Sequence, residues 1–312
     1  MPAPGVVTVT LNPAIDQTLS IPGFAAGRVN RVAESRADAG GKGVNVASFL
    51  ADLEIEVTAT GFLGGENAGL FETLFARKKI TDRFVRIPGS TRVGLKIVDG
   101  PTTTDINFPG LTPARADIGE LFDQIAVLLA PGRWFVLAGS VPGGVADSLY
   151  ADLIEFIHSR GGKTALDTSG PPLREALAGR PTLMKPNVEE LSELAGSPLQ
   201  TPAEVRAAAE ALLDRGVQRV VVSMGGDGAV FVDRGQALLA RPPAVTVRST
   251  VGAGDAMVGG IVAAMLRGLP LEDVARWGTA SGAYAVTRIG AGIEDLAAHR
   301  KLIDEVEIEV LP

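Results

Sequence analysis

Short apolar runs alternate with amphipathic stretches along the whole chain, and this alternation limits the possible folds more than any other feature. Residues 6–11 (VVTVTL) are typical of a strand, residues 43–53 (GVNVASFLADL) have helical spacing, and the pair recurs as EVTATGFLG and AGLFETLFARKK. Strand, crossover helix and strand in succession predict an α/β fold with a mainly parallel sheet covered by helices on both faces. Ligands of such a sheet bind beyond the carboxyl ends of its strands.

One region departs from this pattern. Residues 83–108 alternate with period two, carry β-branched residues and offer no crossover helix, and residues 28–41 are similar. Together they predict a small antiparallel sheet with polar and basic residues on one face. The pattern alone leaves a lid and an edge extension equally open. Because no repeat or linker is visible, we expect one domain over residues 1–312, with lid segments inserted at roughly 16–38 and 88–108.

Composition excludes several classes of function. The 312 residues have a formal net charge of −7, so a general electrostatic footprint for nucleic acid is not expected. Cysteine is absent, which excludes disulfides, thiolate nucleophiles and cysteine metal sites. Only His158 and His299 are available, both in segments that resemble surface helices, so neither a Ser-His-Asp site nor a multi-histidine metal site is predicted.

The first residues and the apolar stretches of the chain indicate the cellular location to expect for the protein. The first residues, MPAPGVVTVTLNPAID, lack a basic segment and a long apolar segment, so they do not resemble a signal peptide. The longest apolar stretches are interrupted well before the ~18 residues that a membrane span needs. We therefore expect a cytoplasmic protein without a membrane partner.

The stretch STVGAGDAMVGG, residues 249–260, is the most informative motif. The preceding AVTVRST, residues 244–250, is predicted to end a strand, and AMVGGIVAAML continues with helical spacing. Gly252, Ala253 and Gly254 would then lie at a helix N-terminus, where free N–H groups favour an anion. Asp255 in the first turn could accept a proton or merely cap the helix, and the motif leaves both open. A dinucleotide site is disfavoured because Met257 occupies the third glycine position.

A second helix start has the same character. In AGGKGVNVASFL, the glycines at 40, 41 and 43 expose backbone, Lys42 supplies a positive charge and Asn45 an amide that could reach sugar hydroxyls. A glycine-rich turn with a solvated lysine is the alternative. Two anion-competent helix starts in one chain suggest two phosphorylated ligands.

Two further motifs each admit a structural and a functional interpretation. In LMKPNVEELSEL, Asn187 and Glu190 have the spacing of a capping box, or they could hold a hydrated Mg²⁺ beside phosphates. In SMGGDG, residues 223–228 could form a hairpin turn or line a nucleotide.

The motifs GGKGVNVA, KPNVEE, SMGGDG and STVGAGDAMVGG, in this order, resemble those of the PfkB or ribokinase-like carbohydrate kinases. The resemblance covers essentially the whole chain, from TLNPAID near the start to TASGAYAVTRIGAG near the end. Many members have D-T-x-G-A-G-D where this chain has S-T-V-G-A-G-D. That form, with TLNPA and GKGVNVA, is similar to the phosphosugar branch of the family. The resemblance implies a ribokinase-like three-layer fold with a small β lid.

The resemblance also implies roles for individual residues. Asp255 would be the general base, with a low pKa from its helix N-terminus, and Gly252, Ala253 and Gly254 would form the anion hole. Cofactor-binding residues for ATP and Mg²⁺ would be Lys185, Asn187, Glu190, Ser223, Gly225, Gly226 and Gly228, with Asn187 and Glu190 holding the metal through water. Sugar-binding residues would be Asp16, Gly40, Gly41, Lys42, Asn45, Arg92, Asn107 and Ser140. A monovalent cation could be lined by Ser249, Val251 and Ala285.

The implied reaction is phosphoryl transfer from ATP to fructose 1-phosphate, giving fructose 1,6-bisphosphate. Lys42 and Arg92 would bind the phosphate that the sugar already carries. Tagatose 6-phosphate or fructose 6-phosphate is the alternative acceptor, and a non-catalytic sugar-phosphate sensor is the alternative from another class. Lids in this family often pair across a dimer, so a homodimer is expected.

Overall fold

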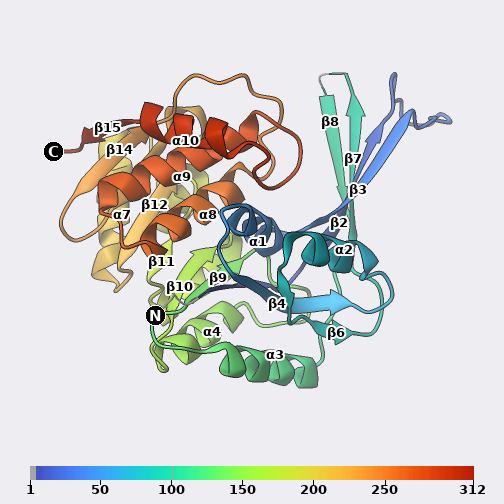
Figure 1. The fold of residues 1–312 in the computed structure, drawn as a ribbon, viewed down its shortest axis with the longest axis horizontal. Helices are drawn as coiled ribbons and strands as arrows, with labels where there is room; N and C mark the ends of the chain where they lie inside the picture. Colours follow the sequence, from blue (N-terminus) through green and yellow to red (C-terminus); the bar gives the residue numbers. More distant parts are fainter. Residues whose placement is uncertain (1–4, 101) are drawn as a thin grey trace.

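The computed structural model describes residues 5–100 and 102–312, so residues 1–4 of the predicted domain and residue 101 of the predicted lid segment lie outside it. Two sheets organise the chain (Figure 1). The large sheet has the spatial order β15 (Glu307–Val310), β14 (Ala237–Arg241), β13 (Ala229–Val232), β12 (Arg219–Ser223), β11 (Leu183–Met184), β10 (Lys163–Asp167), β9 (Trp134–Ala138), β1 (Val6–Thr10), β4 (Val57–Gly64) and β5 (Thr81–Asp82), with β6 (Val85–Ile87) also paired to β4. Strands from β12 to β5 in this order run parallel, while β13, β14 and β15 add antiparallel pairs at one edge.

Helices cover both faces of the large sheet, as the alternation predicted. One face carries α1 (Lys42–Asp52), α2 (Gly69–Lys78), α8 (Ala253–Leu266) and α9 (Leu271–Val286), with α10 (Leu296–Glu305) packed on α9. The other carries α3 (Arg115–Leu128), α4 (Leu149–His158), α5 (Gly170–Ala176), α6 (Val188–Ala195) and α7 (Pro202–Asp214). Short 3₁₀ turns occupy Leu177–Gly179 and Gly225–Asp227. The ribokinase-like three-layer arrangement expected from the motifs is confirmed.

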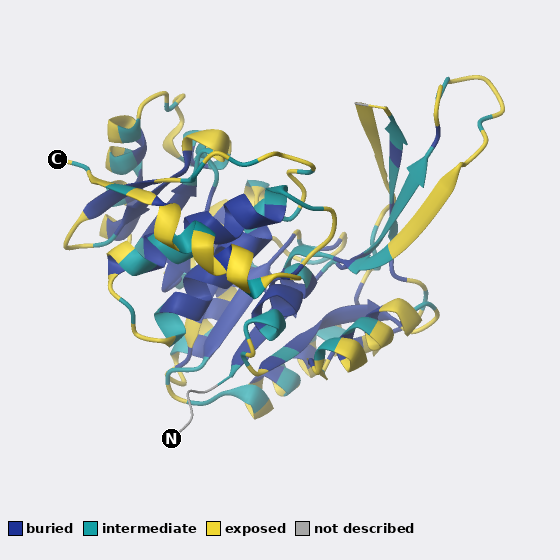
Figure 2. Ribbon diagram, turned by 45° about the horizontal axis from the view of Figure 1, so that its top comes forward, coloured by how far each residue is buried: buried dark blue, intermediate teal, exposed yellow. Residues whose placement is uncertain are grey.

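Period-two alternation in the buried strands divides the core into two halves. Val6 and Val136 face the α1 and α8 side, while Val7 and Phe135 face the α3 and α4 side. All four side chains are buried. The central strands of the large sheet are coloured as buried along most of their length (Figure 2). Because both faces of the parallel strands are covered, their carboxyl ends are held in rigid positions.

The small sheet consists of β3 (Glu34–Gly40), β2 (Ala14–Ser20), β7 (Val93–Asp99) and β8 (Thr102–Asn107), in that order. It projects from the large sheet (Figures 1 and 2). Both outer pairs are antiparallel, as predicted, whereas β2 and β7 in the centre run parallel. Residues 83–87 do not belong to this sheet, because β6 pairs with β4 of the large sheet.

Two expectations from the sequence are wrong in this part of the fold. Residues 244–250 form no strand; they lie in an irregular segment after β14, where the N–H groups of Arg248 and Ser249 donate to the carbonyl of Val286 at 2.7 and 3.2 Å. His299 does not lie on a surface helix. It is fully buried on α10 and packs edge-on against Phe49 and Tyr284, which an amphipathic pattern alone could not distinguish.

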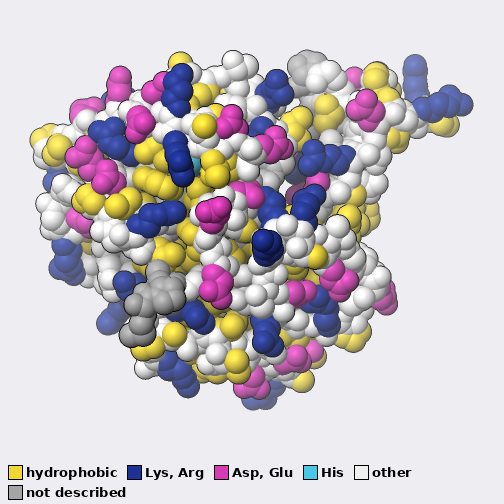
Figure 3. Space-filling view, viewed as in Figure 1, with side chains coloured by type: hydrophobic (Ala, Val, Ile, Leu, Met, Phe, Trp, Pro, Cys, Tyr) yellow, Lys and Arg dark blue, Asp and Glu magenta, His cyan; other side chains and the backbone are white. Residues whose placement is uncertain are grey.

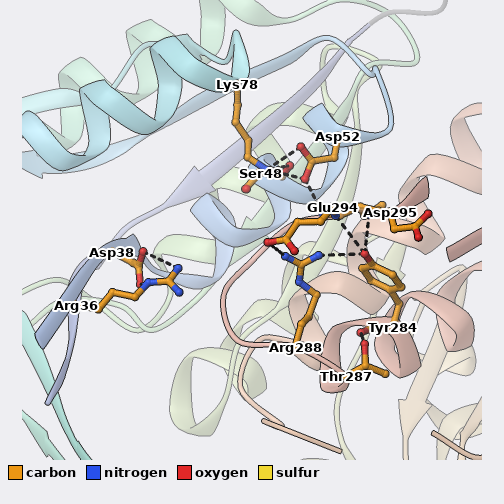
Figure 4. Close-up of polar contacts among 11 residues, drawn as sticks. Arg36, Asp38, Ser48, Asp52, Lys78, Tyr284, Thr287, Arg288, Glu294 and Asp295 are labelled. Atoms are coloured by element: carbon orange, nitrogen blue, oxygen red, sulfur yellow. Dashed lines mark hydrogen bonds and ion pairs between the residues drawn. The ribbon is translucent and has the colours of Figure 1, made fainter. Parts of the chain in front are cut away.

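The segment after α9 is fastened to α1 by a polar network (Figure 4). The Tyr284 hydroxyl accepts hydrogen bonds from Arg288 Nη1 at 3.0 Å and from the N–H groups of Glu294 and Asp295 at 3.1 and 2.9 Å. Asp52, at the end of α1, accepts from the N–H of Ile293 and from Lys78 Nζ, each at 2.6 Å. This network fixes the C-terminal end of α1, whose N-terminal end carries Lys42.

Charged groups of both signs are distributed over the surface. Lysine, arginine, aspartate and glutamate side chains are interspersed on the face seen in Figure 3. Within residues 5–100 and 102–312, no helix has the length and apolar character to cross a membrane.

Candidate active site

A cleft of about 530 Å³ lies at the carboxyl ends of the parallel strands, where the fold predicts a ligand site. It brings together residues from motifs that are far apart in the sequence. The predicted residues that line it are Asp16, Gly41, Lys42, Asn45, Arg92, Ser140, Lys185, Asn187, Glu190, Ser223, Val251, Gly252, Gly254 and Asp255. Gly40, Asn107, Ala253, Gly225, Gly226, Gly228, Ser249 and Ala285 are outside this lining.

Asp255 lies in the first turn of α8, and its carboxylate is buried. Gly252 is the N-cap residue with φ 81°, a left-handed conformation that glycine adopts without strain. Asp255 Oδ2 accepts a hydrogen bond at 2.7 Å from Asn45 Nδ2 on α1. Within the described residues, no backbone N–H of α8 donates to this carboxylate, so the helix-cap interpretation is not supported.

The low pKa expected for Asp255 is wrong. Burial, followed by the negative charge of Asp167, raises the pKa of Asp255 to about 6, although Asn45, Lys42 and Lys185 act in the opposite direction. Desolvation therefore outweighs the helix N-terminus. A carboxylate with this pKa is deprotonated at neutral pH and accepts a proton more readily than an ordinary aspartate.

Asp167, at the end of β10, is a site residue that the motifs missed. Its side chain is buried, and its Oδ1 lies 3.1 Å from Lys42 Nζ and 3.4 Å from Lys185 Nζ. Burial alone would raise the pKa of Asp167, but Lys185 and Lys42 outweigh it and lower the pKa. Burial would likewise lower the pKa of Lys42, but Asp167 and Asp255 outweigh it and raise the pKa. Asp167 and Lys42 are therefore both charged at neutral pH.

Lys185 also reaches the start of α8. A Cβ atom placed on Gly254 would lie 3.4 Å from Lys185 Nζ. The ammonium group and the glycine-rich helix start thus converge on one point. Unpaired N–H groups at a helix N-terminus, together with a cation, make a strong anion site.

Asp16 lies where the small sheet joins the cleft. Burial raises the pKa of Asp16, and the nearby charges of Lys96 and Arg92 limit the rise. A Cβ on Gly40 would lie 2.3 Å from Asp16 Oδ2, so glycine at this position leaves room for the carboxylate. Asn107, although outside the cleft lining, is in register with Gly94, which is itself in register with Asp16.

Arg92 and Ser140 are joined through Asn12, which the motif assignment had passed over. Asn12 Nδ2 donates to Ser140 Oγ at 3.0 Å, and Arg92 Nη2 donates to the Asn12 carbonyl at 3.4 Å. Both Asn12 and Ser169 line the cleft. The available signal for Asn12 and Asp167 was their position at or just after the end of an apolar strand.

Asn187 and Glu190 form the predicted capping box at the start of α6. Asn187 Oδ1 accepts from the Glu190 N–H at 2.7 Å, and Glu190 Oε2 accepts from the Asn187 N–H at 2.8 Å. Asn187 and Glu190 both line the cleft. Within residues 5–100 and 102–312, no group of three or more acidic or histidine side chains could hold a metal alone. This donor set fits Mg²⁺, which keeps waters and shares phosphate ligands.

Ser223 ends β12, and the SMGGDG stretch after it forms the hairpin turn to the antiparallel strand β13. Gly228, with φ 99°, has a structural reason to be glycine, because a Cβ there would lie 2.0 Å from the Ala240 carbonyl oxygen. Neither Gly225 nor Gly226 has a neighbour within 4 Å of an added Cβ. Of this motif, Ser223 alone lines the cleft.

Comparison with solved structures identifies the class. A ribokinase from Thermotoga maritima superposes with a TM-score of 0.79 over 96% of this chain and 99% of that chain, at 22% identity. That likeness establishes the fold. The E. coli phosphofructokinase-2 described in complex with substrates and products superposes with a TM-score of 0.91 at 30% identity, over 96% of this chain and 99% of that chain. The fold is that of the ribokinase-like sugar kinases.

The sequence comparisons define the family. The model described as pfkB family carbohydrate kinase matches residues 7–297. A 1-phosphofructokinase of Rhodobacter capsulatus is 47% identical over 310 residues, which cover 98% of each chain. The chain therefore belongs to the pfkB family of carbohydrate kinases, as the motifs indicated.

Proposed function

We propose that this chain transfers the γ-phosphoryl group of ATP to the 6-hydroxyl of D-fructose 1-phosphate, producing D-fructose 1,6-bisphosphate and ADP. The observation that carries the proposal is a buried carboxylate, Asp255, at a glycine-rich helix start that shares its cleft with Lys42 and Arg92. The 1-phosphofructokinase relative supports the choice of acceptor, because it is more similar to this chain than the phosphofructokinase-2 is.

Asp255 would act as the general base. As the sugar oxygen bonds to the γ-phosphorus, the proton of the 6-hydroxyl passes to the Asp255 carboxylate, and the bond from phosphorus to the bridging oxygen of ADP breaks. Asn45 orients the carboxylate through its 2.7 Å hydrogen bond. The raised pKa of Asp255 suits this step, because a base whose pKa is closer to the working pH accepts the proton more effectively.

The start of α8 would stabilise the charge on the transferred group. The N–H groups of Gly252 and Gly254 lie at the helix N-terminus, and Lys185 Nζ lies beside Gly254. The N–H of Ala253, which the motif had placed in the anion hole, donates instead to the Thr250 carbonyl at 3.4 Å. Prearranged donors in a site that excludes water lower the energy of a charged transition state.

The nucleotide and its metal would occupy the side of the cleft near α6. Glu190 and Asn187 would hold Mg²⁺ through water, and the bound metal would neutralise charge on the ATP phosphates. Ser223 would border the nucleotide, with Gly225, Gly226 and Gly228 giving the shape of the turn behind it. Val251 lines the cleft, so a monovalent cation near Ser249, Val251 and Ala285 remains part of the proposal.

The sugar would lie between α1 and the small sheet. Asp16 and Asn45 would accept and donate hydrogen bonds to its hydroxyls, with Asn107 and Ser140 at the margins. Lys42, Arg92 and the backbone at Gly40 and Gly41 would bind its existing phosphate. A neutral sugar needs no such pair of cations, which supports a phosphosugar.

The small sheet would act as a lid on a single kinase domain comprising residues 1–312. Closure over the sugar excludes water, which would otherwise accept the phosphoryl group. Ile106 and Phe108 at its edge are exposed apolar residues. A second copy of the chain pairing there would cover them, so we expect a homodimer by light scattering.

The decisive measurement is ADP release with fructose 1-phosphate, fructose 6-phosphate and tagatose 6-phosphate in parallel. We expect the highest kcat/KM with fructose 1-phosphate. A higher value with either 6-phosphate would transfer the assignment to 6-phosphofructokinase or tagatose-6-phosphate kinase, because the same clamp could hold a sugar in the reverse orientation. Binding of all three without ADP release would indicate a sugar-phosphate sensor.

A further inference from the structure

A single buried carboxylate connects the two halves of the cleft. Lys42 begins α1, on the sugar side, and Lys185 follows β11, on the nucleotide side. Both ammonium groups lie against the same oxygen, Asp167 Oδ1, at 3.1 and 3.4 Å. Since they share one oxygen, they lie close enough together to contact one phosphoryl group at the same time.

The position of Asp167 has little value for the fold itself. Its Oδ2 is buried and has no hydrogen-bond partner among the described residues, which is costly for a charged oxygen. Buried ion pairs seldom stabilise a protein more than apolar packing would. Two lysines sharing one carboxylate also retain positive charge between them. An arrangement that is costly for folding and faces a cleft is typical of a functional site.

The surroundings of Lys42 and Lys185 indicate what they act on. Lys185 Nζ lies at the start of α8, beside Gly254, and Lys42 opens the glycine-rich start of α1. The free N–H groups of both helix starts favour anions. The phosphoryl group would pass between these two points during transfer. Charge placed there in advance needs no rearrangement during the reaction.

We propose that Asp167 is a positioning residue that holds the ammonium groups of Lys42 and Lys185 at the two helix starts, so that both contact the phosphoryl group in transit. The inference rests on the proposed kinase function and adds a residue to it. It also moves Lys42 from the phosphate that the sugar already carries, which Arg92 would then bind, to the phosphoryl group in transit. Asp167 touches neither substrate in this role; it acts through the two lysines. Its negative charge also acts on Asp255, which lines the same cleft as Asp167, Lys42 and Lys185.

The test replaces Asp167 with asparagine, which keeps the shape of the side chain and removes its charge. We expect kcat to fall roughly 100-fold, the loss typical of misplaced catalytic groups, with much smaller changes in the KM values. The acid limb of the kcat/KM profile should also move to lower pH, because a negative charge that raises the pKa of Asp255 is gone. A purely structural role would not move that limb.

Asp233→Asn is the matched control. Asp233 pairs with Arg219 at 3.1 Å and lines a different cavity, at residues 216–219 and 233–235. The same substitution there should lower the melting temperature and leave kcat and the acid limb unchanged. If Asp167→Asn behaves like Asp233→Asn, the proposal is overturned.

A second variant covers the case in which Asp167→Asn does not fold. Asp167→Glu keeps the charge but moves the carboxylate by one methylene, so kcat should fall while the acid limb stays in place. Full kcat in folded Asp167→Glu contradicts a positioning role. Failure of both variants to fold contradicts it as well, because Asp167 would then serve the core.

The reactivity of Lys42 separates this proposal from the proposed function. All variants are assayed with whichever phosphosugar the wild-type enzyme uses best. If it uses none, the proposed function fails, and the proposal is judged on Lys42 in the full-length chain. Asp167 helps to raise the pKa of Lys42, so in Asp167→Asn this lysine should react faster with an amine reagent, as measured by mass spectrometry. An unchanged rate would show that Asp167 does not hold Lys42.

Discussion

The two sheets of this protein contribute to the same cleft in different ways. Strands β9 and β10 of the large sheet are almost entirely buried, and their carboxyl ends place polar groups such as Asp167 rigidly. Strand β8 of the small sheet is exposed along its whole length, and β3 along most of it. In the proposed function, the buried strands would supply fixed charges for the reaction, whereas the thinly packed sheet would supply sugar contacts that can move.

The groups that depend on the large sheet should therefore control kcat, and those that depend on the small sheet should control the KM for the sugar. Asp16 belongs to β2 of the small sheet, and Asp255 to a helix that packs on the large sheet. Substitutions at these two places test whether the two sheets act separately.

Removal of the base should have the largest effect. We expect Asp255→Asn to lower kcat by about 10²-fold or more, because the amide cannot accept the proton of the sugar hydroxyl. ATP affinity, measured by calorimetry, should remain near the wild-type value. Asp304→Asn on the exposed surface of α10 is the control and should have no effect. Full turnover by Asp255→Asn would reduce this residue to a structural role.

The pH dependence should show the next largest effect. Only the deprotonated carboxylate of Asp255 can act as base, and its pKa is raised to about 6. The kcat/KM value should therefore be constant above that pH and fall tenfold for each pH unit below it. An initial-rate series from pH 4.5 to 8.5 measures this limb. A limb near pH 4 instead would mean that water reaches Asp255 and that the cleft is not as dry as its burial indicates.

The small sheet is tested most selectively through Gly40. The added methyl group of Gly40→Ala would meet Asp16 Oδ2, and the flexible carboxylate should rotate away while the fold is retained. We expect the KM for the phosphosugar to rise about tenfold, the equivalent of one lost hydrogen bond to a charged group, with kcat less affected. The KM for ATP should not change.

Gly69→Ala provides the matched control for Gly40→Ala. Gly69 begins α2, is exposed, and has no atom within 4 Å of an added Cβ. This substitution should leave all kinetic constants unchanged and slightly stabilise the helix, by about 0.5–1 kcal/mol. If kcat in Gly40→Ala falls by as large a factor as the KM for the sugar rises, the two sheets do not act separately.

Much of the fold could be predicted because local patterns repeat. Strands such as Val6–Thr10 and helices such as Pro202–Asp214 follow from their periodicity and, for the helix, from the capping residue Thr201. The strand predicted at residues 244–250 does not form. Alternation alone does not make a strand, because a strand also needs a neighbouring strand to pair with. The surface position predicted for His299 was wrong because burial depends on which other elements pack against the helix. The residues that cover His299, Phe49 and Tyr284, come from other helices.

The candidate site likewise contains some residues that could be predicted from the sequence and others that could not. Motifs with glycine, lysine and aspartate at helix starts predicted Asp255, Lys42 and the Asn187–Glu190 pair, since helix termini carry their own chemical signature. Asp167 and Asn12 carry no such signature, because a polar residue after a strand acquires meaning only when neighbouring strands are known. The pKa of Asp255 could not be predicted either, because desolvation is a property of the packed protein.

Periodicity and local motifs were enough to predict the fold class, the two anion-competent helix starts and the candidate base, Asp255. Tertiary structure alone decided the rest. Folding placed Asp167 between Lys42 and Lys185, and it buried Asp255 so that its pKa rose instead of falling. The physical reason is that charge interactions and desolvation depend on distance and on the exclusion of water, and both arise when segments 125 or 210 residues apart in the chain meet.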